Sequence, residues 1–184
     1  MNTCYAPEVP PAAYLALRAK LDRFAADVAA RQSEHMLCRA GCDGCCHTKL
    51  SLSDVEAQVL RDALAAMPAA KRKALSSRSD EVRCRLLDDA GRCALYDARP
   101  LVCRSQGLPL RYPPDTIPVE SVRARAADAE VTWCPLNFED VTPAADDILD
   151  AERVDVVLAV INRQVSDTPL RRTSIDAIVD EAAS

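Results

Sequence analysis

The chain has 184 residues, a formal net charge of −5 and an apolar fraction of 49%, which fits a folded protein with its own core. The negative charge argues against a nucleic-acid binder, which must neutralise phosphates, and against an anionic membrane surface. Nine cysteines without a secretory signal pattern or a long apolar segment favour a reducing cytoplasm, where cysteines serve as metal ligands more often than as disulfides.

The first part of the chain is expected to be a flexible N-terminal segment followed by one long helix. We expect residues 1–9 to be a flexible N-terminus, with Cys4 as a bystander thiol, and residues 10–184 to form a single cysteine-cluster metal-binding domain. From Pro10 to Met36, apolar residues recur every three or four positions, which predicts a long amphipathic helix. Its buried stripe would be Tyr14, Leu17, Leu21, Phe24 and Val28.

A cysteine-dense segment follows that helix. Four cysteines fall within nine residues, together with two glycines and no bulky apolar side chain: Cys38, Cys42, Cys45 and Cys46. Such a segment cannot form a core, but it suits a tight loop that turns several sulfurs toward one point. Thiolates at this spacing bind zinc, or iron as an iron–sulfur cluster. His35 and His47 flank the segment and are weaker ligand candidates, with His35 expected as a half-buried helix-end residue.

The adjacent pair Cys45 and Cys46 carries a geometric implication. Neighbouring side chains of an extended backbone point to opposite sides, so the two sulfurs do not easily occupy two corners of one mononuclear site. A turn at Gly44 eases this constraint. The simplest solution is that the pair serves two metal ions, or bridges a polynuclear site.

The remaining elements predict a mainly α fold: a small single domain of helices around a loop-rich polycysteine metal centre. Ser53 to Glu56 is a capping box that opens a helix, and Pro68 ends it and begins another that runs to about Arg83. Two further helices are predicted over 144–166 and from Thr173 or Ser174. One very short β-hairpin near 85–96 is expected as the only β structure. The proline-rich residues 105–132 are expected to be a long loop, with a possible short helix near Val119–Ala127.

The second half supplies four more cysteines, and their context has a known counterpart. They are Cys84, Cys93, Cys103 and Cys134. With the first segment they resemble the YkgJ-like cysteine-cluster family, which carries the CxxCxxCC signature. The shared positions besides the cysteines are Leu86, Leu87, Gly91, Leu95, Tyr96, Arg99, Pro100 and Arg104.

The resemblance covers about residues 38–104, with Cys134 beyond, and implies zinc or iron chelation by the eight cysteines without a settled reaction. This chain has one more residue between Cys38 and Cys42 than the signature has, which we interpret as loop-length variation. Eight thiols suffice for two four-cysteine zinc sites, for one cluster plus one zinc, or for a polynuclear site. The segments 38–52 and 105–135 have too little apolar surface to order themselves, so we expect metal–thiolate bonds to order them.

Several neighbours of the cysteines have two interpretations. Arg39, Arg99 and Arg104 either offset the negative charge of metal-bound thiolates or form surface ion pairs. Tyr96 is expected to pack under the hairpin rather than act as a catalytic acid. Trp133 is expected to shield the site from water.

Two other functional classes stay open. The first is a zinc-stabilised protein-interaction module without catalysis, which would explain why no nucleophile–base pair is evident. The sequence does not identify a protein partner for it. Nor does the sequence indicate any catalytic residues. An iron–sulfur redox or radical-type enzyme component is the other, because Cys38, Cys42 and Cys45 have the spacing that radical S-adenosylmethionine enzymes use. The absence of alternating strand and helix patterns, and Gly44 where such enzymes usually have an aromatic residue, argue against it.

Overall fold

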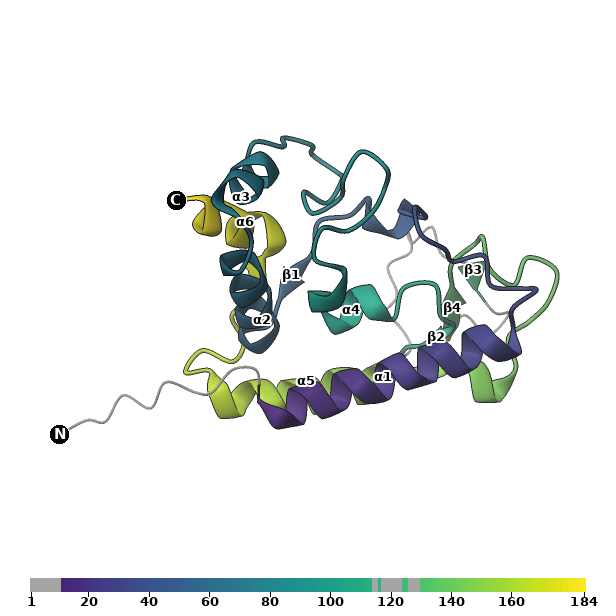
Figure 1. The fold of residues 1–184 in the computed structure, drawn as a ribbon. Helices are drawn as coiled ribbons and strands as arrows, with labels where there is room; N and C mark the ends of the chain where they lie inside the picture. The colour runs from purple at the N-terminus through teal and green to yellow at the C-terminus, as the bar shows by residue number, and fades with distance from the viewer. Residues whose placement is uncertain (1–10, 114–115, 117–123, 126–129) are drawn as a thin grey trace.

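The computed structural model describes residues 11–113, 116, 124–125 and 130–184. The expectations for residues 1–9 and Cys4 lie outside these residues. The fold is mainly α, as predicted, with only short strands (Figure 1). Within the described part of the chain, no helix is both long and apolar enough to cross a membrane. The helices are α1 Ala12–Arg31, α2 Asp54–Ala65, α3 Ala69–Ser76, α4 Leu101–Arg104, α5 Ala151–Val165 and α6 Ile175–Ala183.

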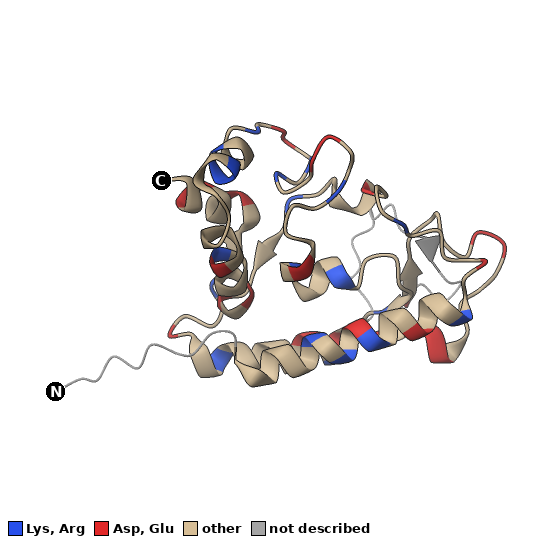
Figure 2. Ribbon diagram, viewed as in Figure 1, with Lys and Arg blue, Asp and Glu red and all other residues tan. Residues whose placement is uncertain are grey.

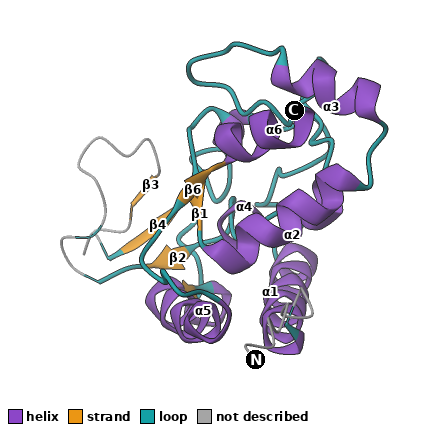
Figure 3. Ribbon diagram, turned by 90° about the vertical axis from the view of Figure 1, so that its left-hand side faces the viewer, coloured by secondary structure: helices purple, strands orange, loops and turns teal. Residues whose placement is uncertain are grey.

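The long helices α1 and α5 lie side by side and form the base of the molecule (Figures 1 and 3). The predicted stripe of α1 faces inward, with Tyr14, Leu21 and Val28 buried in a cluster that also holds Leu158 and Ile161 of α5. This set is called the first hydrophobic cluster below. The amphipathic pattern therefore identified the right face of both helices, because one buried stripe per helix is what pairwise packing requires.

The helix α1 ends at Arg31, earlier than the predicted Met36. Arg31 and Gln32 both turn to Asp147: Nε and Nη2 of Arg31 donate to Oδ1 at 3.0 and 2.7 Å, and Nε2 of Gln32 donates to Oδ2 at 2.7 Å. Asp147 is buried, so these bonds satisfy a carboxylate that would otherwise be costly.

A second hydrophobic cluster joins α2, α3 and α6 at the other end of the molecule, and includes Leu60, Leu64, Leu75, Ile178 and Val179. Figure 3 shows α3 and α6 away from α1 and α5, whereas α2 lies next to α1 and also places Val55 and Val59 in the first hydrophobic cluster. Two strands, β1 Ser51–Leu52 and β6 Thr173–Ser174, pair antiparallel and tie the start of α2 to the start of α6.

The helix starts were predicted better than the helix ends. The helix α2 begins after Ser53 as the capping box indicated, but the Ser53 hydroxyl donates to Glu56 at 2.9 Å and does not cap the helix. The helix α3 ends at Ser76, short of the predicted Arg83, and Val82 is 55% exposed. The helix α6 begins at Ile175, next to the predicted start at Thr173 or Ser174, and Ser174 caps it through a bond from Ala177 N of 3.1 Å.

The β content is the main correction. The expected hairpin near 85–96 exists as one antiparallel bridge between Leu87 and Cys93, and it is not the only β structure. A four-stranded sheet has the order β3-β4-β2-β5, in which β2 and β5 are parallel and the other pairs antiparallel. Its strands are β2 Leu110–Arg111, β3 Ala124–Arg125, β4 Val131–Trp133 and β5 Leu149–Asp150.

Two sequence interpretations fail because of this sheet. The interval 105–132 contains strands rather than only loop, and the helix expected near 119–127 meets β3 at 124–125, while its other residues lie outside the described ones. The predicted helix over 144–166 begins only at Ala151, since the 3-10 helix Ala145–Asp147 and β5 precede it. Strands of two or three residues are too short to produce a readable alternation of apolar and polar residues.

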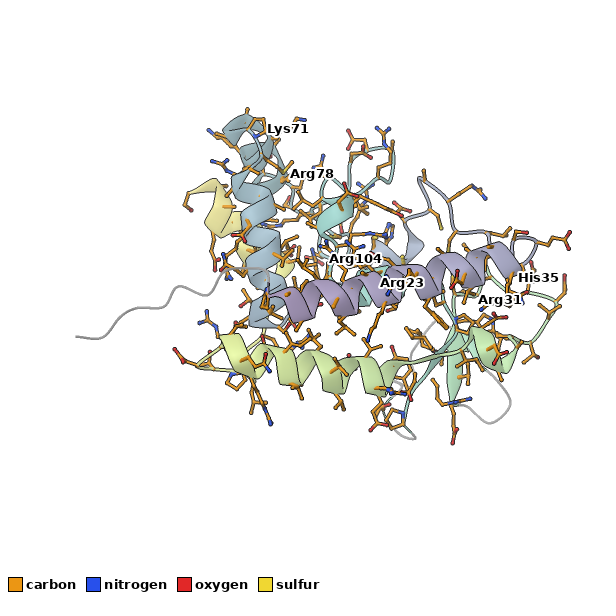
Figure 4. All side chains as sticks on the ribbon, turned by 60° about the horizontal axis from the view of Figure 1, so that its bottom comes forward. Arg23, Arg31, His35, Lys71, Arg78 and Arg104 are labelled. Atoms are coloured by element: carbon orange, nitrogen blue, oxygen red, sulfur yellow. The ribbon has the colours of Figure 1, made fainter. Side chains whose placement is uncertain are left out.

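Charges of both signs are mixed along the ribbon, including on α1 and around the cysteine loops (Figure 2). Figure 4 places Lys71 of α3 and Arg78 just beyond α3 well away from Arg31 and His35 at the C-terminal end of α1. Arg72 lies between Lys71 and Lys73 in sequence but is partly buried, and it donates to the carbonyl oxygens of Ala182 and Met67 at 2.8 and 2.6 Å. It therefore fastens α3 to α6.

Candidate metal centre

The first cysteine segment is a tight loop, as predicted. Cys42 N donates to Arg39 O at 3.0 Å and Cys46 N donates to Asp43 O at 2.8 Å, which makes two successive turns. The second turn is the 3-10 helix Gly44–Cys46. Gly41 between the turns has φ +85°, a conformation that glycine adopts without strain. The loop thus presents its sulfurs from a backbone that curls on itself.

A second loop, residues 84–93, is held against the first by backbone contact. Cys84 N donates to Cys46 O at 2.9 Å. Gly91 has φ +71°, and a Cβ placed there would lie 2.9 Å from Gly41 O, so the two glycine turns approach more closely than any larger residue permits. The carboxylate of Asp43 lies 3.6 Å from Nη2 of Arg83, which adds a charged contact across the same junction.

The turn of this second loop is built on Asp88. Its Oδ1 accepts from Ala90 N at 2.9 Å and from Arg92 N at 2.8 Å, and its own N–H donates to Arg92 O at 2.8 Å. An aspartate that binds the backbone ahead of it is a common way to close a turn. The turn sets Cys84 and Cys93 at the two ends of one loop.

Cys103 is carried by the short helix α4, and a buried carboxylate holds the start of that helix. Glu56 is 3% exposed, and its Oε1 accepts from Leu101 N at 2.9 Å. The first N–H groups of a helix have no partner within it, so a carboxylate there satisfies one donor and interacts favourably with the helix dipole. The sequence indicated Glu56 only as part of a capping box, and its long-range role had no local signal.

Cys134 lies beside Cys38 through a turn that the sequence did not reveal. Asn137 N donates to Cys134 O at 2.9 Å, and Phe138 N donates to His35 O at 2.8 Å. Phe138 has φ +53° and is buried, so the turn is fixed by packing. The side-chain amide of Asn137 reaches the Cys38 sulfur at 3.3 Å.

Electrostatic interactions among the thiols divide them into two groups. Burial raises the pKa of Cys38, and the nearby thiols of Cys134, Cys42 and Cys45 raise it further, against the hydrogen bond from Asn137. We call Cys38, Cys42 and Cys134 the first cysteine group.

The second cysteine group comprises Cys46, Cys84, Cys93 and Cys103. Burial raises the pKa of Cys103 to about 12, with Cys84, Cys93 and Cys45 contributing in the same direction. The pKa of Cys46 is raised first by its hydrogen bond to Cys45, then by burial, and then by thiols that include Cys103 and Cys84. Cys45 therefore interacts with thiols of both groups.

The thiols do not yet surround a common point. Among the residues that the structure describes, no three His, Cys, Asp or Glu side chains are arranged so that they could hold a metal ion as they stand. The backbone brings the two cysteine loops into contact through the bond from Cys84 N to Cys46 O. The donor set itself, thiols alone in a partly buried setting, suits zinc or iron.

The second group lines a cavity of about 450 Å³, together with Cys42 and Cys45. Arg39 and Arg99 also line it. Much of the remaining lining is apolar and comes from Leu50, Leu60, Leu86, Leu87, Leu95, Pro100 and Ile175. The first group is different, since Cys38 and Cys134 do not line this cavity.

The arginines take separate roles. Nη1 of Arg104 donates to both carboxylate oxygens of Asp22 at 2.8 and 2.9 Å, and its Nε donates to Arg99 O at 2.7 Å. Arg104 therefore joins α4, which carries Cys103, to α1 (Figure 4). The charge of Arg99 lowers the pKa values of Cys93 and Cys103, against the larger effect of burial. Its guanidinium lies 3.6 Å from the centroid of the Tyr96 ring.

Three other predicted neighbours are now placed. Tyr96 is 60% exposed, so the expectation that it packs under the hairpin is wrong, and its ring supports Arg99 instead. His35 is half-buried as expected, while His47 is exposed with its Nε2 3.5 Å from Asp43. Trp133 is buried in the first hydrophobic cluster and anchors the strand that leads to Cys134.

Comparison with known proteins returned one family model. The model named CxxCxxCC, with the description "putative zinc- or iron-chelating domain", matches residues 37–135. This interval begins just before Cys38 and ends just after Cys134, so it contains both cysteine groups. Neither the curated proteins nor the solved structures gave a match.

Proposed function

This chain belongs to the CxxCxxCC family of zinc- or iron-chelating domains, and we propose that its eight cysteines hold metal in two neighbouring thiolate centres. The first centre uses Cys38, Cys42 and Cys134 with Cys45. The second uses Cys46, Cys84, Cys93 and Cys103. Four thiolates complete the shell of a tetrahedral zinc ion, and the same number of cysteines binds an iron–sulfur cluster.

The observation that carries this proposal is the position of the Cys45–Cys46 pair. The Cys38 thiol interacts with Cys45, whereas the Cys46 thiol interacts with Cys84 and Cys103. Cys45 thus interacts with thiols of both groups, and an adjacent pair placed in this way can supply one sulfur to each of two centres. With one sulfur of the pair in each centre, each centre has four cysteine ligands.

The surrounding charges support thiolate ligands at the second centre. Four thiolates around one divalent ion leave a formal charge of −2, and the guanidinium of Arg99 lies close enough to lower the pKa values of Cys93 and Cys103. Arg99 is held in place by its Nε bond to Tyr96 O of 3.1 Å and by the Tyr96 ring. A fixed cation beside anionic ligands stabilises the metal-bound form.

One observation favours an iron–sulfur cluster over zinc at the second centre. Sulfurs around a single zinc ion lie about 3.7–3.8 Å apart, which follows from Zn–S bonds of about 2.3 Å and leaves no internal space. The second group instead lines a cavity of about 450 Å³. We therefore hold a polynuclear iron–sulfur cluster there as the second candidate, with a redox role in place of a structural one.

The test is anaerobic purification followed by an absorption spectrum and by measurement of metal and acid-labile sulfide per chain. A colourless protein with two zinc ions supports two four-thiolate zinc centres. A broad visible band with iron and sulfide supports the cluster. Cys4→Ser is the matched control for the eight single serine variants and should leave the metal content unchanged. A metal content unaffected by any of the eight would reject the proposal.

A further inference from the structure

Asn137 is a fully buried polar residue for which the sequence pattern gave no role. It is 0% exposed, and every hydrogen-bonding group of its side-chain amide has a partner. Its Oδ1 accepts from Leu37 N at 2.9 Å, and its Nδ2 donates to Gly107 O at 2.9 Å and to the Cys38 sulfur at 3.3 Å. An asparagine amide has two N–H donors and one carbonyl oxygen, so these three bonds use all its groups.

Two of these bonds fix which way the amide points. Leu37 N can only donate and Gly107 O can only accept, so a flipped amide would put donor against donor and acceptor against acceptor. The N–H of Asn137 must therefore face the Cys38 sulfur. A sulfur accepts such a bond most strongly when it is a thiolate or a metal ligand, since charged acceptors make the stronger hydrogen bonds.

Gly107 restricts the same sulfur from the other side. A Cβ at Gly107 would lie 2.5 Å from the Cys38 sulfur, and its φ of +91° also requires glycine. The Cys38 side chain is thus packed between the backbone of Gly107 and the amide of Asn137. The backbone N–H of Asn137 meanwhile binds Cys134 O at 2.9 Å, so one residue contacts two cysteines of the first group.

We propose that Asn137 is a positioning residue of the first centre, which orients the Cys38 sulfur toward the metal and holds Cys134 beside it. This inference rests on the proposed function. Outer partners that orient metal ligands typically change metal affinity by about 10–100-fold when they are removed. Asn137 should act on the first centre, because the two cysteines that its hydrogen bonds reach, Cys38 and Cys134, both belong to the first group.

Asn162 provides a matched control. It is 2% exposed, its Oδ1 accepts from Val55 N at 3.0 Å, and its Nδ2 donates to Pro169 O at 3.0 Å. It therefore makes two backbone bonds of the same kind as Asn137, but neither bond reaches a sulfur. Loss of Asn162 should lower the melting temperature without a selective effect on the first centre.

The experiment compares Asn137→Asp and Asn137→Ala with Asn162→Asp and Asn162→Ala, with Co²⁺ as the spectroscopic probe. We expect both Asn137 variants to lose about 10–100-fold in Co²⁺ affinity at one of two centres. In Asn137→Ala the sulfur-to-cobalt band of that centre should move to longer wavelength, because a sulfur without its hydrogen bond is easier to oxidise.

The outcomes separate this inference from the proposed function. If the wild-type chain binds only one Co²⁺, or none, the two-centre proposal is wrong, and the role of Asn137 that rests on it falls as well. A wild type with two centres, and Asn137 variants with unchanged affinity and band position, overturns the role of Asn137 alone. Equal weakening of both centres, or the same effect in the Asn162 variants, would also overturn it, since that pattern belongs to general destabilisation. If Asn137→Asp does not fold, Asn137→Ala alone decides.

Discussion

The two cysteine groups differ in what surrounds them. In the first group, the Cys38 sulfur contacts the Asn137 amide and lies against the Gly107 backbone. Cys38 and the neighbouring Cys45 lie at an exposed loop edge. The second group lines an apolar cavity, with Arg99 as a nearby cation. A centre fixed by hydrogen bonds to its ligands is suited to a single ion of fixed geometry, whereas a centre in an apolar cavity has room for a larger inorganic group.

The supports of the two groups also come from different parts of the chain. The first depends on the turn after Cys134, which leads from the four-stranded sheet. The second depends on Glu56 of α2 and on the second hydrophobic cluster, which includes Cys84 and Cys93 among its packed neighbours. Each group can therefore be disturbed without direct contact with the other, and the following predictions use that property.

Metal removal should have the largest effect. Structural metal–thiolate sites contribute on the order of 10 kcal/mol of binding free energy, and residues 38–52 have little apolar surface to replace it. After chelation we expect trypsin to cleave within 38–52 while α1 and α5 remain protected, because their packing uses no thiol. Identical cleavage and melting temperature with and without metal would show that the metal is peripheral.

Metal affinity should rise steeply with pH. Burial raises the pKa values of Cys38, Cys84, Cys93 and Cys103, so these thiols are protonated at neutral pH without metal. Each must lose its proton to bind metal, so raising the pH toward the thiol pKa favours binding and lowering it favours release. Four protons per centre correspond to about 5 kcal/mol of binding free energy per pH unit.

Chelator competition at several pH values, with proton release measured by a pH indicator, checks this dependence. The apolar surroundings of the second group predict that its metal is released at the higher pH of the two. A pH-independent affinity would contradict thiol ligation.

Replacement of Glu56 should affect the second centre selectively. Glu56→Ala leaves the buried Leu101 N–H without its acceptor, which costs about 1–3 kcal/mol in unfolding free energy. Because α4 carries Cys103, metal should be lost from the second centre first. Glu56→Gln keeps an acceptor and should lie closer to wild type, and Asp62→Ala on the exposed side of α2 is the control. Equal loss from both centres would remove Glu56 from this role.

Gly91→Ala should loosen the junction between the two cysteine loops. The added Cβ would lie 2.9 Å from Gly41 O at a φ of +71°, so we expect a cost of about 1–2 kcal/mol in unfolding free energy. Gly44→Ala is the control, because nothing lies within 4 Å of a Cβ there and its φ is not in the left-handed region. Chemical denaturation of both variants measures the difference, and equal stability would show that the close approach is unimportant.

Much of this organisation was predictable from the sequence, for definite reasons. The stripes of α1 and α5 and the start of α6 near Ser174 come from periodic or local signals, and the structure confirms them. The CxxCxxCC resemblance depended on cysteines and on residues such as Gly91 and Pro100 at fixed spacings, and the family match confirms it. The spacings matter because the turns at Gly41 and Gly91 approach each other so closely that a Cβ at Gly91 would lie 2.9 Å from Gly41 O.

The contacts around the cysteines were not predictable in the same way. The bonds of Asn137 to Cys38 and of Glu56 to Leu101 join residues 99 and 45 positions apart. No local pattern encodes such pairs, because an isolated buried asparagine or glutamate looks like any surface residue in the sequence. The short strands were missed because two residues cannot show an alternation, and Tyr96 was misplaced because its partner is the charged Arg99.

The division of the cysteines into two centres is tested most directly by the metal content of two sets of variants. Metal per chain should be measured in Cys38→Ser and Cys134→Ser against Cys84→Ser and Cys93→Ser. The account predicts that each variant loses the metal of its own centre and keeps that of the other, and that Cys45→Ser and Cys46→Ser show opposite preferences. One metal ion per native chain, fully retained in Cys46→Ser, would contradict the two-centre account.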